Sequence, residues 1–528
     1  MRIELTTRKV VTFAIAILIS GAAAGALFGT PTVSDDERRV VQRASQIATE
    51  LLEWLPEEEK PSDIVYKGIS GMLEVLDPHS NFLDPKTYRK MRERQEGSFF
   101  GVGIIISRRD GKVTVIAPMP GTPAAGKGLR AGDIIAAVDG VETEDITLDE
   151  VVDHVRGPEG SPVVLLIRRP GLQDPFDVKI LRARIPTTSV RFAFMIQPEV
   201  GYIRLGEFSN TSVREVREAV DQLRDEGMKS LIFDLRNNPG GPLDAAVGIS
   251  DLFLRKDQLI VSTRGRTDGS VSTLSAPGYQ GRFNGPLVIL VNTGSASASE
   301  IVAGAVQDHD RGLVVGETTW GKGLVQTVFG VRDGGLALTT ARYYTPSGRC
   351  IQRDYESFID YITHRNGDED PSGREVYESD AGRTVLGGGG INPDVTISNR
   401  ELAESLVRMY GSSAFFRFAV ELLKDIPEAD QGGFAETFDP SGSGLETFLS
   451  WVETDEILSE EVLEEFKTDS QAMADAGRAL KIELLNATVG LEAGYREAID
   501  ADDQFRGALE HLVDAEDLWE AWPKEEES

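Results

Sequence analysis

Two short and mostly apolar stretches constrain the fold of this 528-residue chain more than any other feature. LIFDLR at 231–236 and LVILVN at 287–292 are each followed by a loop rich in small residues and then by a helical pattern. Short apolar strands that alternate with helices are typical of a parallel sheet covered by helices. Residues 186–400 repeat this strand–loop–helix order, so we predict an α/β core there.

The chain is long enough for several domains, and its pattern changes along its length. It exceeds the size of one hydrophobic core, so three or four folded units are expected. Residues 35–96 place apolar side chains at helical spacing, whereas residues 97–185 switch to short strands with glycine turns. We therefore predict a helical N-terminal segment at 35–96, a strand-rich domain at 97–185, the core at 186–400 and a helical extension at 401–528.

The formal net charge of −31 lies mostly at the C-terminal end. Residues 401–528 contain 9 lysines and arginines against 32 aspartates and glutamates, a difference of −23. This acidic balance disfavours a nucleic-acid partner. We interpret the acidic residues as the solvated surface of the helical extension.

The first thirty residues differ in composition from the rest. Three basic residues precede an uncharged stretch at 10–29, and three acidic residues follow it at 35–37. The stretch is long enough to cross a bilayer, and the order of charges keeps the N-terminus in the cytoplasm. It ends in AAAGA, whose small residues suit signal cleavage. We predict a signal peptide or membrane anchor at 1–30, in preference to a buried helix. The body is then extracytoplasmic, in the periplasm or on the outer face of the cell membrane.

In the strand-rich domain, the glycine loop in FFGVGIIIS is followed by LRAGD, by an Asp-Gly turn and by the helical pattern LDEVVDHV, in that order. This order resembles a PDZ domain of the bacterial kind. Gly101, Val102, Gly103 and Ile104 match the loop whose N–H groups receive the C-terminal carboxylate of a peptide. Glycines allow close backbone approach, and the adjacent strand edge can accept an added strand.

Three segments follow apolar strands, where α/β proteins place their sites: 237–241, 294–300 and 321–326. The second contains Ser295, Ser297 and Ser299, alternating with alanines before a helical pattern. A serine at this position has an exposed hydroxyl beside the N–H groups that begin a helix, which suits nucleophilic catalysis. Close packing of small residues would give the same pattern, and the pattern alone does not single out one serine.

A serine nucleophile needs a base, and the composition favours a lysine. Of five histidines only His309 is near in sequence, beyond a helix of about twelve residues, and no histidines or cysteines show metal-ligand spacing. Lys322 is the one lysine between 256 and 424, and glycines flank it. To act as a base, its pKa must fall about three units from roughly 10.4, or ~4 kcal/mol, which burial can supply. Gln326 could hold the amine by a hydrogen bond.

The motifs together resemble the C-terminal processing peptidases, or tail-specific proteases. They are GSASASEIVAGAVQD, LIFDLRNNPGG, GETTWGKGLVQ and YYTPSGR, and the resemblance spans about residues 35–400. It implies that Ser297 is the nucleophile, Lys322 the general base and Gln326 the residue that orients the lysine. Ser295 then belongs to the approach loop, and Ser299 is expected to cap the following helix.

The resemblance also implies an oxyanion hole and a fold. The oxyanion would be bound by the N–H of Ala298 and by a glycine of NPGG, with Gly240 preferred to Gly241. The protease core would be crotonase-like, of the ββα kind, so the whole chain is a multidomain α/β protein with an inserted PDZ domain. The acidic extension is less typical of the family, and its role is left open.

The implied activity is that of a serine endopeptidase for exported proteins. The PDZ domain would capture accessible C-terminal tails, and the chain would be cleaved through an acyl-enzyme that water hydrolyses. No cofactor is expected. A regulatory adaptor and a homo-oligomer are compatible with the family, and an uncleaved N-terminal segment would add contact with the membrane.

Two other interpretations remain open, and two more are disfavoured. The protein could be an exported PDZ scaffold with an inactive protease core, or a hydrolase that depends on His79 or His309. Cys350 lies in a turn flanked by strand patterns with no base near it in sequence, so a thiol nucleophile is disfavoured. The close spacing of Asp77, His79 and Ser80 suggests a triad, but adjacent residues point in different directions and we expect a structural turn.

Overall fold

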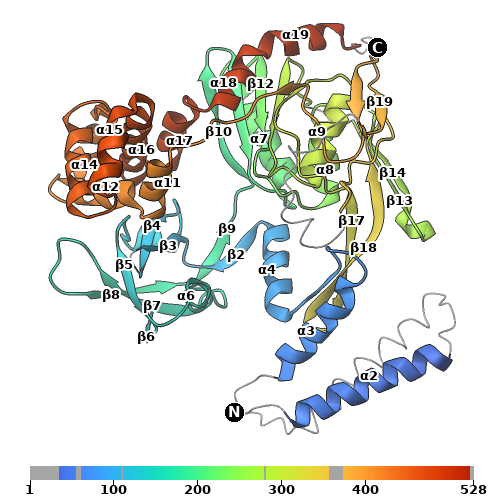
Figure 1. Ribbon diagram of the computed structural model, residues 1–528, viewed down its shortest axis with the longest axis horizontal. Coiled ribbons are helices and arrows are strands. Elements are labelled where there is room, and N and C mark those ends of the chain that lie inside the picture. Colours follow the sequence, from blue (N-terminus) through green and yellow to red (C-terminus); the bar gives the residue numbers. More distant parts are fainter. Residues whose placement is uncertain (1–34, 55–60, 110, 279–280, 356–372, 524–528) are drawn as a thin grey trace. The chain divides into compact units, whose positions relative to one another are not determined.

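The computed structural model describes residues 35–54, 61–109, 111–278, 281–355 and 373–523 (Figure 1). The chain divides into two compact units. The first consists of residues 1–88 and 326–339, and the second of residues 89–325 and 340–528.

The first unit is built on helices and a small sheet. Its helices are α2 (Asp35–Glu53) and α3 (Pro61–Glu74), as the helical spacing predicts. The next helix, α4 (Pro85–Glu96), begins in this unit, but most of its residues belong to the second. Strand β1 (Asn81–Leu83) pairs antiparallel with the first part of β18 (Gly334–Tyr344).

The turn before β1 is held by one carboxylate. Asp77 accepts hydrogen bonds from the N–H groups of His79 and Ser80, at 2.8 Å each, and from the Ser80 hydroxyl at 2.6 Å. These local bonds make the segment a structural turn, as expected.

The strand-rich region forms an antiparallel sheet with strand order β3-β4-β5-β7-β8, in which β3 is an edge strand. Its core gathers valine, isoleucine and leucine side chains from the strands and from α6. The antiparallel pair of β2 (Ser98–Gly101) and β9 (Ala183–Pro186) encloses the region at its two ends in sequence. The elements between are β3 (Ile104–Arg109), β4 (Lys112–Pro118), α5 (Pro123–Gly126), β5 (Ile134–Val138), β6 (Val141–Glu142), α6 (Leu148–Val155), β7 (Pro162–Arg168) and β8 (Phe176–Leu181).

The predicted α/β core is confirmed by a six-stranded sheet with order β10-β11-β12-β15-β16-β21. All neighbouring strands run parallel except β10 and β11. The two apolar stretches supply its adjacent middle strands, β12 and β15. The strands are β10 (Val190–Gln197), β11 (Val200–Leu205), β12 (Ser230–Asp234), β15 (Leu287–Val291), β16 (Leu313–Gly316) and β21 (Val395–Thr396).

Helices cover both faces of this sheet. On one face, apolar side chains of α7 (Ser212–Asp225), α8 (Leu243–Asp251) and α9 (Ala298–Asp308) share a core with the strands. On the other face lie α17 (Leu491–Ile499), α18 (Asp503–Glu510) and α19 (Leu512–Ala521), drawn in red in Figure 1. The last part of the extension therefore packs on the core sheet.

The rest of the extension is a helical bundle with its own apolar core. Its helices are α11 (Glu404–Gly411), α12 (Ala414–Leu423), α13 (Glu428–Thr437), α14 (Ser443–Thr454), α15 (Glu460–Thr468) and α16 (Ser470–Thr488). The long helix α16 contacts α12, α13, α14 and α15. In this core the ring of Phe448 stacks on Phe415 and meets Phe418 edge to face.

The remaining strands form smaller pairings. In the second unit β13 (Leu259–Gly265) pairs with β14 (Ser272–Ser275) and with the last part of β18. Strand β17 (Leu324–Val331) pairs with β18, and β19 (Val376–Glu378) with β20 (Thr384–Leu386). Among the described residues, no helix is both long and apolar enough to cross a bilayer. The uncharged stretch at 10–29 lies outside the described residues.

Candidate active site

Ser297 lies at the junction of the buried strand β15 and helix α9. It is the residue before the first helical position, and its backbone has φ +55° and ψ −110°. This conformation is rare for a residue with a side chain and costs about 1–3 kcal/mol. The strained turn places Ser297 at the end of the helix where backbone N–H groups lack helical partners.

The other two serines of the run are fully buried and structural. The Ser295 hydroxyl donates to the carbonyl of Leu235 at 2.8 Å, and the Ser299 hydroxyl donates to the carbonyl of Asn238 at 2.9 Å. The expectation that Ser299 caps α9 is wrong, because Ser297 occupies the capping position and Ser299 lies inside the first turn.

Glu300 joins the backbones of the predicted nucleophile and base. Its side chain is fully buried, and its Oε2 atom accepts from the N–H of Ser297 at 2.7 Å and from the N–H of Lys322 at 3.0 Å. Its Oε1 atom accepts from the Thr319 hydroxyl at 2.6 Å and from the N–H of Gly321 at 2.7 Å. Burial raises the pKa of this carboxyl, and the four hydrogen bonds oppose that rise.

Glu300 is the site residue that reasoning from sequence missed, because it lies within the helical pattern that follows the three serines. The signal was present in the spacing. A serine followed three positions later by a glutamate is the pattern in which the acid reaches back to the N–H of the capping residue.

Tyr343, on β18, holds the same two backbones from a second side. Its buried hydroxyl donates to the carbonyl of Ser297 at 3.2 Å and to the carbonyl of Lys322, and its N–H donates to Gly323 at 2.9 Å. Ser297 and Lys322 are therefore tied together through one acid and one phenol.

The environment of Lys322 changes its acidity in the direction required of a base. Burial lowers the pKa of the ammonium group, and the nearby Glu300 charge opposes this shift. A lysine with a lowered pKa is neutral, and so able to accept a proton, over a wider range of pH.

The loop at 237–241 lies against the start of α9. A side chain at Gly240, whose φ is +92°, would come within 2.7 Å of the Ala296 carbonyl and 2.8 Å of the Ala298 nitrogen. In the described part of the chain, the N–H of Ala298 has no hydrogen-bond partner. The N–H of Gly240 donates to the Asn238 side chain at 2.9 Å, whereas that of Gly241 makes no bond to a described residue. Gly240, the preferred oxyanion donor, would therefore have to share its hydrogen or release Asn238.

Gln326 belongs to the first compact unit. There its side-chain amide donates to the carbonyl of His79 at 2.5 Å. Its predicted action on the lysine remains a prediction.

His309 lies at the opposite end of α9 from Ser297. Eleven residues at 1.5 Å each separate the two ends by about 16 Å. Its ring nitrogens contact the Asp380 carboxylate and the Leu259 carbonyl, at 2.7 Å each. A base acting directly on Ser297 cannot be this residue.

The PDZ-like loop has the features expected of a carboxylate site. Its carbonyls are held by the fold, since Val102 accepts from the N–H of Ala124 at 2.9 Å and Gly103 from the Thr122 hydroxyl at 3.0 Å. Gly103 has φ +81°, and a side chain there would overlap Thr122. Within the described structure, the N–H groups of Val102 and Gly103 have no partner, so they are available to an anion. Gly101 ends β2 and Ile104 begins the edge strand β3.

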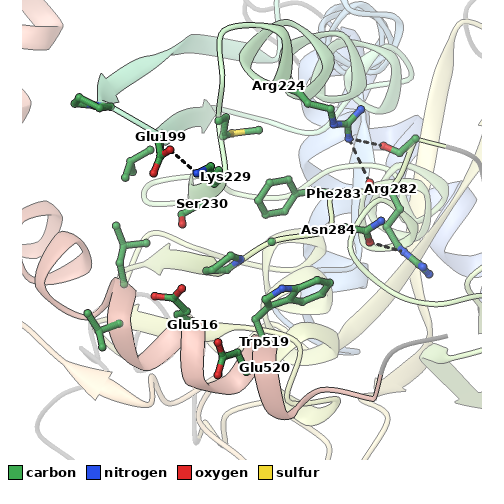
Figure 2. Close-up of a pocket in the computed structure, with 18 of the residues that line it drawn as sticks. Glu199, Arg224, Lys229, Ser230, Arg282, Phe283, Asn284, Glu516, Trp519 and Glu520 are labelled. Carbon is green, nitrogen blue, oxygen red and sulfur yellow. Dashed lines mark hydrogen bonds and ion pairs between the residues drawn. The ribbon is translucent and has the colours of Figure 1, made fainter. Parts of the chain in front are cut away.

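A cavity of about 1180 Å³ lies at a different place on the core. Figure 2 shows Phe283 and Trp519 among its lining residues, with an ion pair of 2.5 Å between Lys229 and Glu199. Its lining includes Ser230 and Pro286, where β12 and β15 begin, whereas the Ser297 turn follows the end of β15. The cavity is therefore separate from the candidate active site. Within the described residues, no group of three or more histidine, cysteine or acidic side chains could hold a metal ion.

Comparisons with known proteins identify the family. The model for peptidase family S41 matches residues 199–357, and the PDZ domain model matches residues 114–169. A carboxy-terminal-processing protease from Bartonella bacilliformis is 41% identical over 303 residues, which cover 56% of this chain and 68% of that protein. The chain belongs to peptidase family S41.

Membership makes the protein a serine-type peptidase of the C-terminal processing kind, with a PDZ domain, as the motifs implied. The carboxyl-terminal-processing protease of a Picosynechococcus species is 39% identical over 293 residues, 54% of this chain and 70% of that protein. The solved structure of a photosystem II D1 C-terminal processing protease shares 29% identity and covers 67% of this chain and 86% of its own, with a TM-score of 0.35.

Proposed function

We propose that Ser297 and Lys322 carry out peptide-bond hydrolysis as a nucleophile and its general base. The observation that supports the pair most directly is the shared oxygen of Glu300, which accepts the N–H groups of both residues. The lowered pKa of Lys322 adds the required chemistry.

The reaction has two halves. The neutral amine of Lys322 takes the hydroxyl proton as the Ser297 oxygen bonds to the carbonyl carbon of the substrate. When the C–N bond breaks, the ammonium returns the proton to the leaving amine and an acyl-enzyme remains. Water then adds to the ester with the same lysine as base, which releases the acid and restores the serine.

The developing oxyanion would be bound by backbone N–H groups. Ala298 supplies one of them, and the loop at Gly240 and Gly241 supplies the second. Both lie beside the Ser297 turn, and preorganised donors of this kind are worth about 3–4 kcal/mol each in acyl transfer. Gln326 is proposed to orient the amine of Lys322.

The substrates are proposed to be exported proteins with accessible C-terminal tails. A terminal carboxylate would bind the N–H groups of the loop from Gly101 to Ile104, and the tail would add as a strand to the edge of β3. The proposed location is extracytoplasmic, by way of the segment at 1–30. A regulatory adaptor and self-association remain compatible with this role, and no cofactor is required.

The catalytic assignment can be tested with protein that lacks residues 1–30. We expect it to cleave unfolded casein, and we expect Ser297→Ala and Lys322→Ala each to lower kcat by at least 1,000-fold without loss of fold. His309→Ala and His79→Ala should retain activity. Cleavage by the Ser297→Ala protein would contradict the nucleophile. An inactive but folded parent protein would favour a PDZ scaffold.

Tail binding is tested separately, in the Ser297→Ala background so that the peptide is not consumed. Two peptides of one apolar sequence, ending in a free carboxylate or in an amide, are compared by fluorescence anisotropy. We expect at least tenfold weaker binding of the amide, because it lacks the charge that the loop N–H groups would receive. Equal affinities would rule out carboxylate recognition.

A further inference from the structure

The final helices of the chain are part of the peptidase core, although they lie far beyond residue 357, where the family match ends. Side chains of α17, α18 and α19, including Ile499, Phe505 and Ala515, share one apolar cluster with Tyr202 and Leu290 of the sheet. A parallel sheet needs cover on both faces, and these helices supply the cover on one of them.

These helices also contact Arg236, the residue before the loop at 237–241, which we call the catalytic loop. Arg236 follows β12, and its side chain is 3% exposed. Its Nη1 atom donates to both carboxylate oxygens of Asp502, at 2.8 and 2.7 Å, and to the side-chain oxygen of Gln504 at 3.1 Å. Its Nε and Nη2 atoms donate to Asp234.

The guanidinium is thus held between one carboxylate of the sheet and one of the C-terminal helices. Asp234 is fully buried, and the Arg236 charge with its hydrogen bonds overcomes burial and keeps the pKa of that carboxyl below its ordinary value. A buried cation that loses a partner is costly, since the remaining charge is left poorly solvated. Asp502 therefore fixes one side of Arg236.

Arg236 is connected by the chain to the groups that surround the nucleophile. Two residues on, Asn238 is fully buried, and its carbonyl accepts from the N–H of Ala296 at 3.0 Å and from the Ser299 hydroxyl. The Asn238 side chain holds Gly240. A shift of Arg236 would consequently move the loop that faces Ser297.

We propose that Asp502 is a positioning residue for the catalytic loop, acting through Arg236, and that the C-terminal helices thereby complete the active site. The proposal rests on the proposed roles of Ser297 and of the loop at 237–241. Because the loop would bind the transition state and not the captured tail, loss of Asp502 should affect kcat more than KM.

The test is the substitution Asp502→Asn in the otherwise complete protein. Asparagine keeps the shape of the side chain and can still cap α18, whose Phe505 N–H donates to Asp502 at 2.9 Å, but it removes the charge. We expect kcat to fall 10- to 100-fold and KM to stay within twofold of its value in the unsubstituted protein. Affinity for a peptide boronic acid, which forms a tetrahedral adduct with serine, should fall by the same factor as kcat.

Asp503→Asn is the matched control, since the ion pairs of this neighbouring acid with described residues are long ones to exposed arginines, at 3.9 and 4.0 Å. It should leave kcat unchanged. In the double variant Asp502→Asn/Gln504→Glu a carboxylate returns to the same guanidinium nitrogen, at the loss of the hydrogen bond of 3.0 Å from the Gln504 amide to the Ile397 carbonyl, and we expect at least a threefold gain in kcat over Asp502→Asn. Recovery would show that the loss in Asp502→Asn comes from the missing negative charge beside Arg236 and not from a general loss of structure.

Several results would overturn the proposal. They are an unchanged kcat in Asp502→Asn, a loss fully explained by the unfolded fraction in circular dichroism, or a folded double variant without recovery. Failure of the underlying function has a different signature, because Ser297→Ala would then retain activity whatever Asp502 does.

Discussion

At the scale of single residues, the site depends on side chains that do not react. Ser297 has an unfavourable backbone conformation, and strain of this kind persists only where neighbours fix it. Glu300 accepts a hydrogen bond from the N–H of Ser297, and Tyr343 donates one to the Ser297 carbonyl. Each of the two side chains also hydrogen-bonds the backbone of Lys322. The geometry of the pair is therefore set by backbone hydrogen bonds.

Tyr343→Phe tests this view with the loss of one oxygen atom. We expect kcat to fall about fivefold with little change in KM, because one hydrogen bond that joins the two backbones is lost and about 1 kcal/mol is at stake. Steady-state kinetics on a tailed peptide measures the split. Tyr344→Phe is the control, since the ring of Tyr344 faces Arg264 instead, and equal losses in both variants would contradict the role of Tyr343.

The acidity of Lys322 predicts the pH dependence of the reaction. The base works only when neutral, and its pKa is lowered below the ordinary 10.5, so kcat/KM should rise with pH and level off before pH 10.5. The direction of this pH dependence is fixed, because below its own pKa Lys322 is protonated and cannot accept a proton. A pH–rate profile measures this limb, and a profile that falls over the same range would contradict a lysine base.

At the scale of elements, the loop at 237–241 packs so closely against the start of α9 that residue 240 of the loop must be glycine. Gly240→Ala would place a methyl group 2.7 Å from the Ala296 carbonyl at a φ of +92°. We expect at least 100-fold loss of kcat and a lower melting temperature.

Gly227→Ala provides the matched control for that substitution. Gly227 has φ +99° but open space around it, so the backbone strain is similar and the crowding is absent. It should cost about 1 kcal/mol of stability and leave kcat intact. Equal activity of the two variants would show that close packing at Gly240 is unimportant.

Elements were predicted well where the signal is local. The apolar strands β12 and β15, the glycine turns of the PDZ-like region and the place of the serine run before a helix follow from short patterns of residues, whereas the choice of Ser297 within that run came from the family resemblance. The predicted capping role of Ser299 was wrong. Its hydroxyl donates instead to the carbonyl of Asn238, a residue 61 positions away in sequence that the local pattern does not reveal. The placement of α17 to α19 on the sheet also escaped prediction, since amphipathic spacing shows that a helix buries one face without showing against what.

At the scale of the whole molecule, the acidic extension has two different parts. The bundle from α11 to α16 has its own apolar core, whereas α17 to α19 share theirs with the sheet. Trp519 and Trp522 cover the buried guanidinium of Arg311, at 4.6 and 5.1 Å from their ring centres, and Trp522 donates to the His309 carbonyl at 3.0 Å. The end of the described chain is thus anchored to the core.

Trp522→Ala should destabilise the peptidase core and not the bundle. Loss of a buried indole costs about 3–5 kcal/mol, and Arg311 would lose part of its aromatic cover. Urea unfolding followed by hydrogen exchange should show earlier opening of the core sheet, with the bundle helices unchanged. Uniform destabilisation of both parts would contradict separate cores.

The position of Asp502 has a consequence for the order of events during synthesis. Translation produces Ser297, Lys322 and the PDZ domain long before it reaches Asp502. If Asp502 positions the catalytic loop as proposed, the contact with Arg236 forms only after nearly every other described residue has been made. A nascent chain is unfolded and easily cleaved, and in this molecule full catalytic activity would arise only after Asp502 has been made.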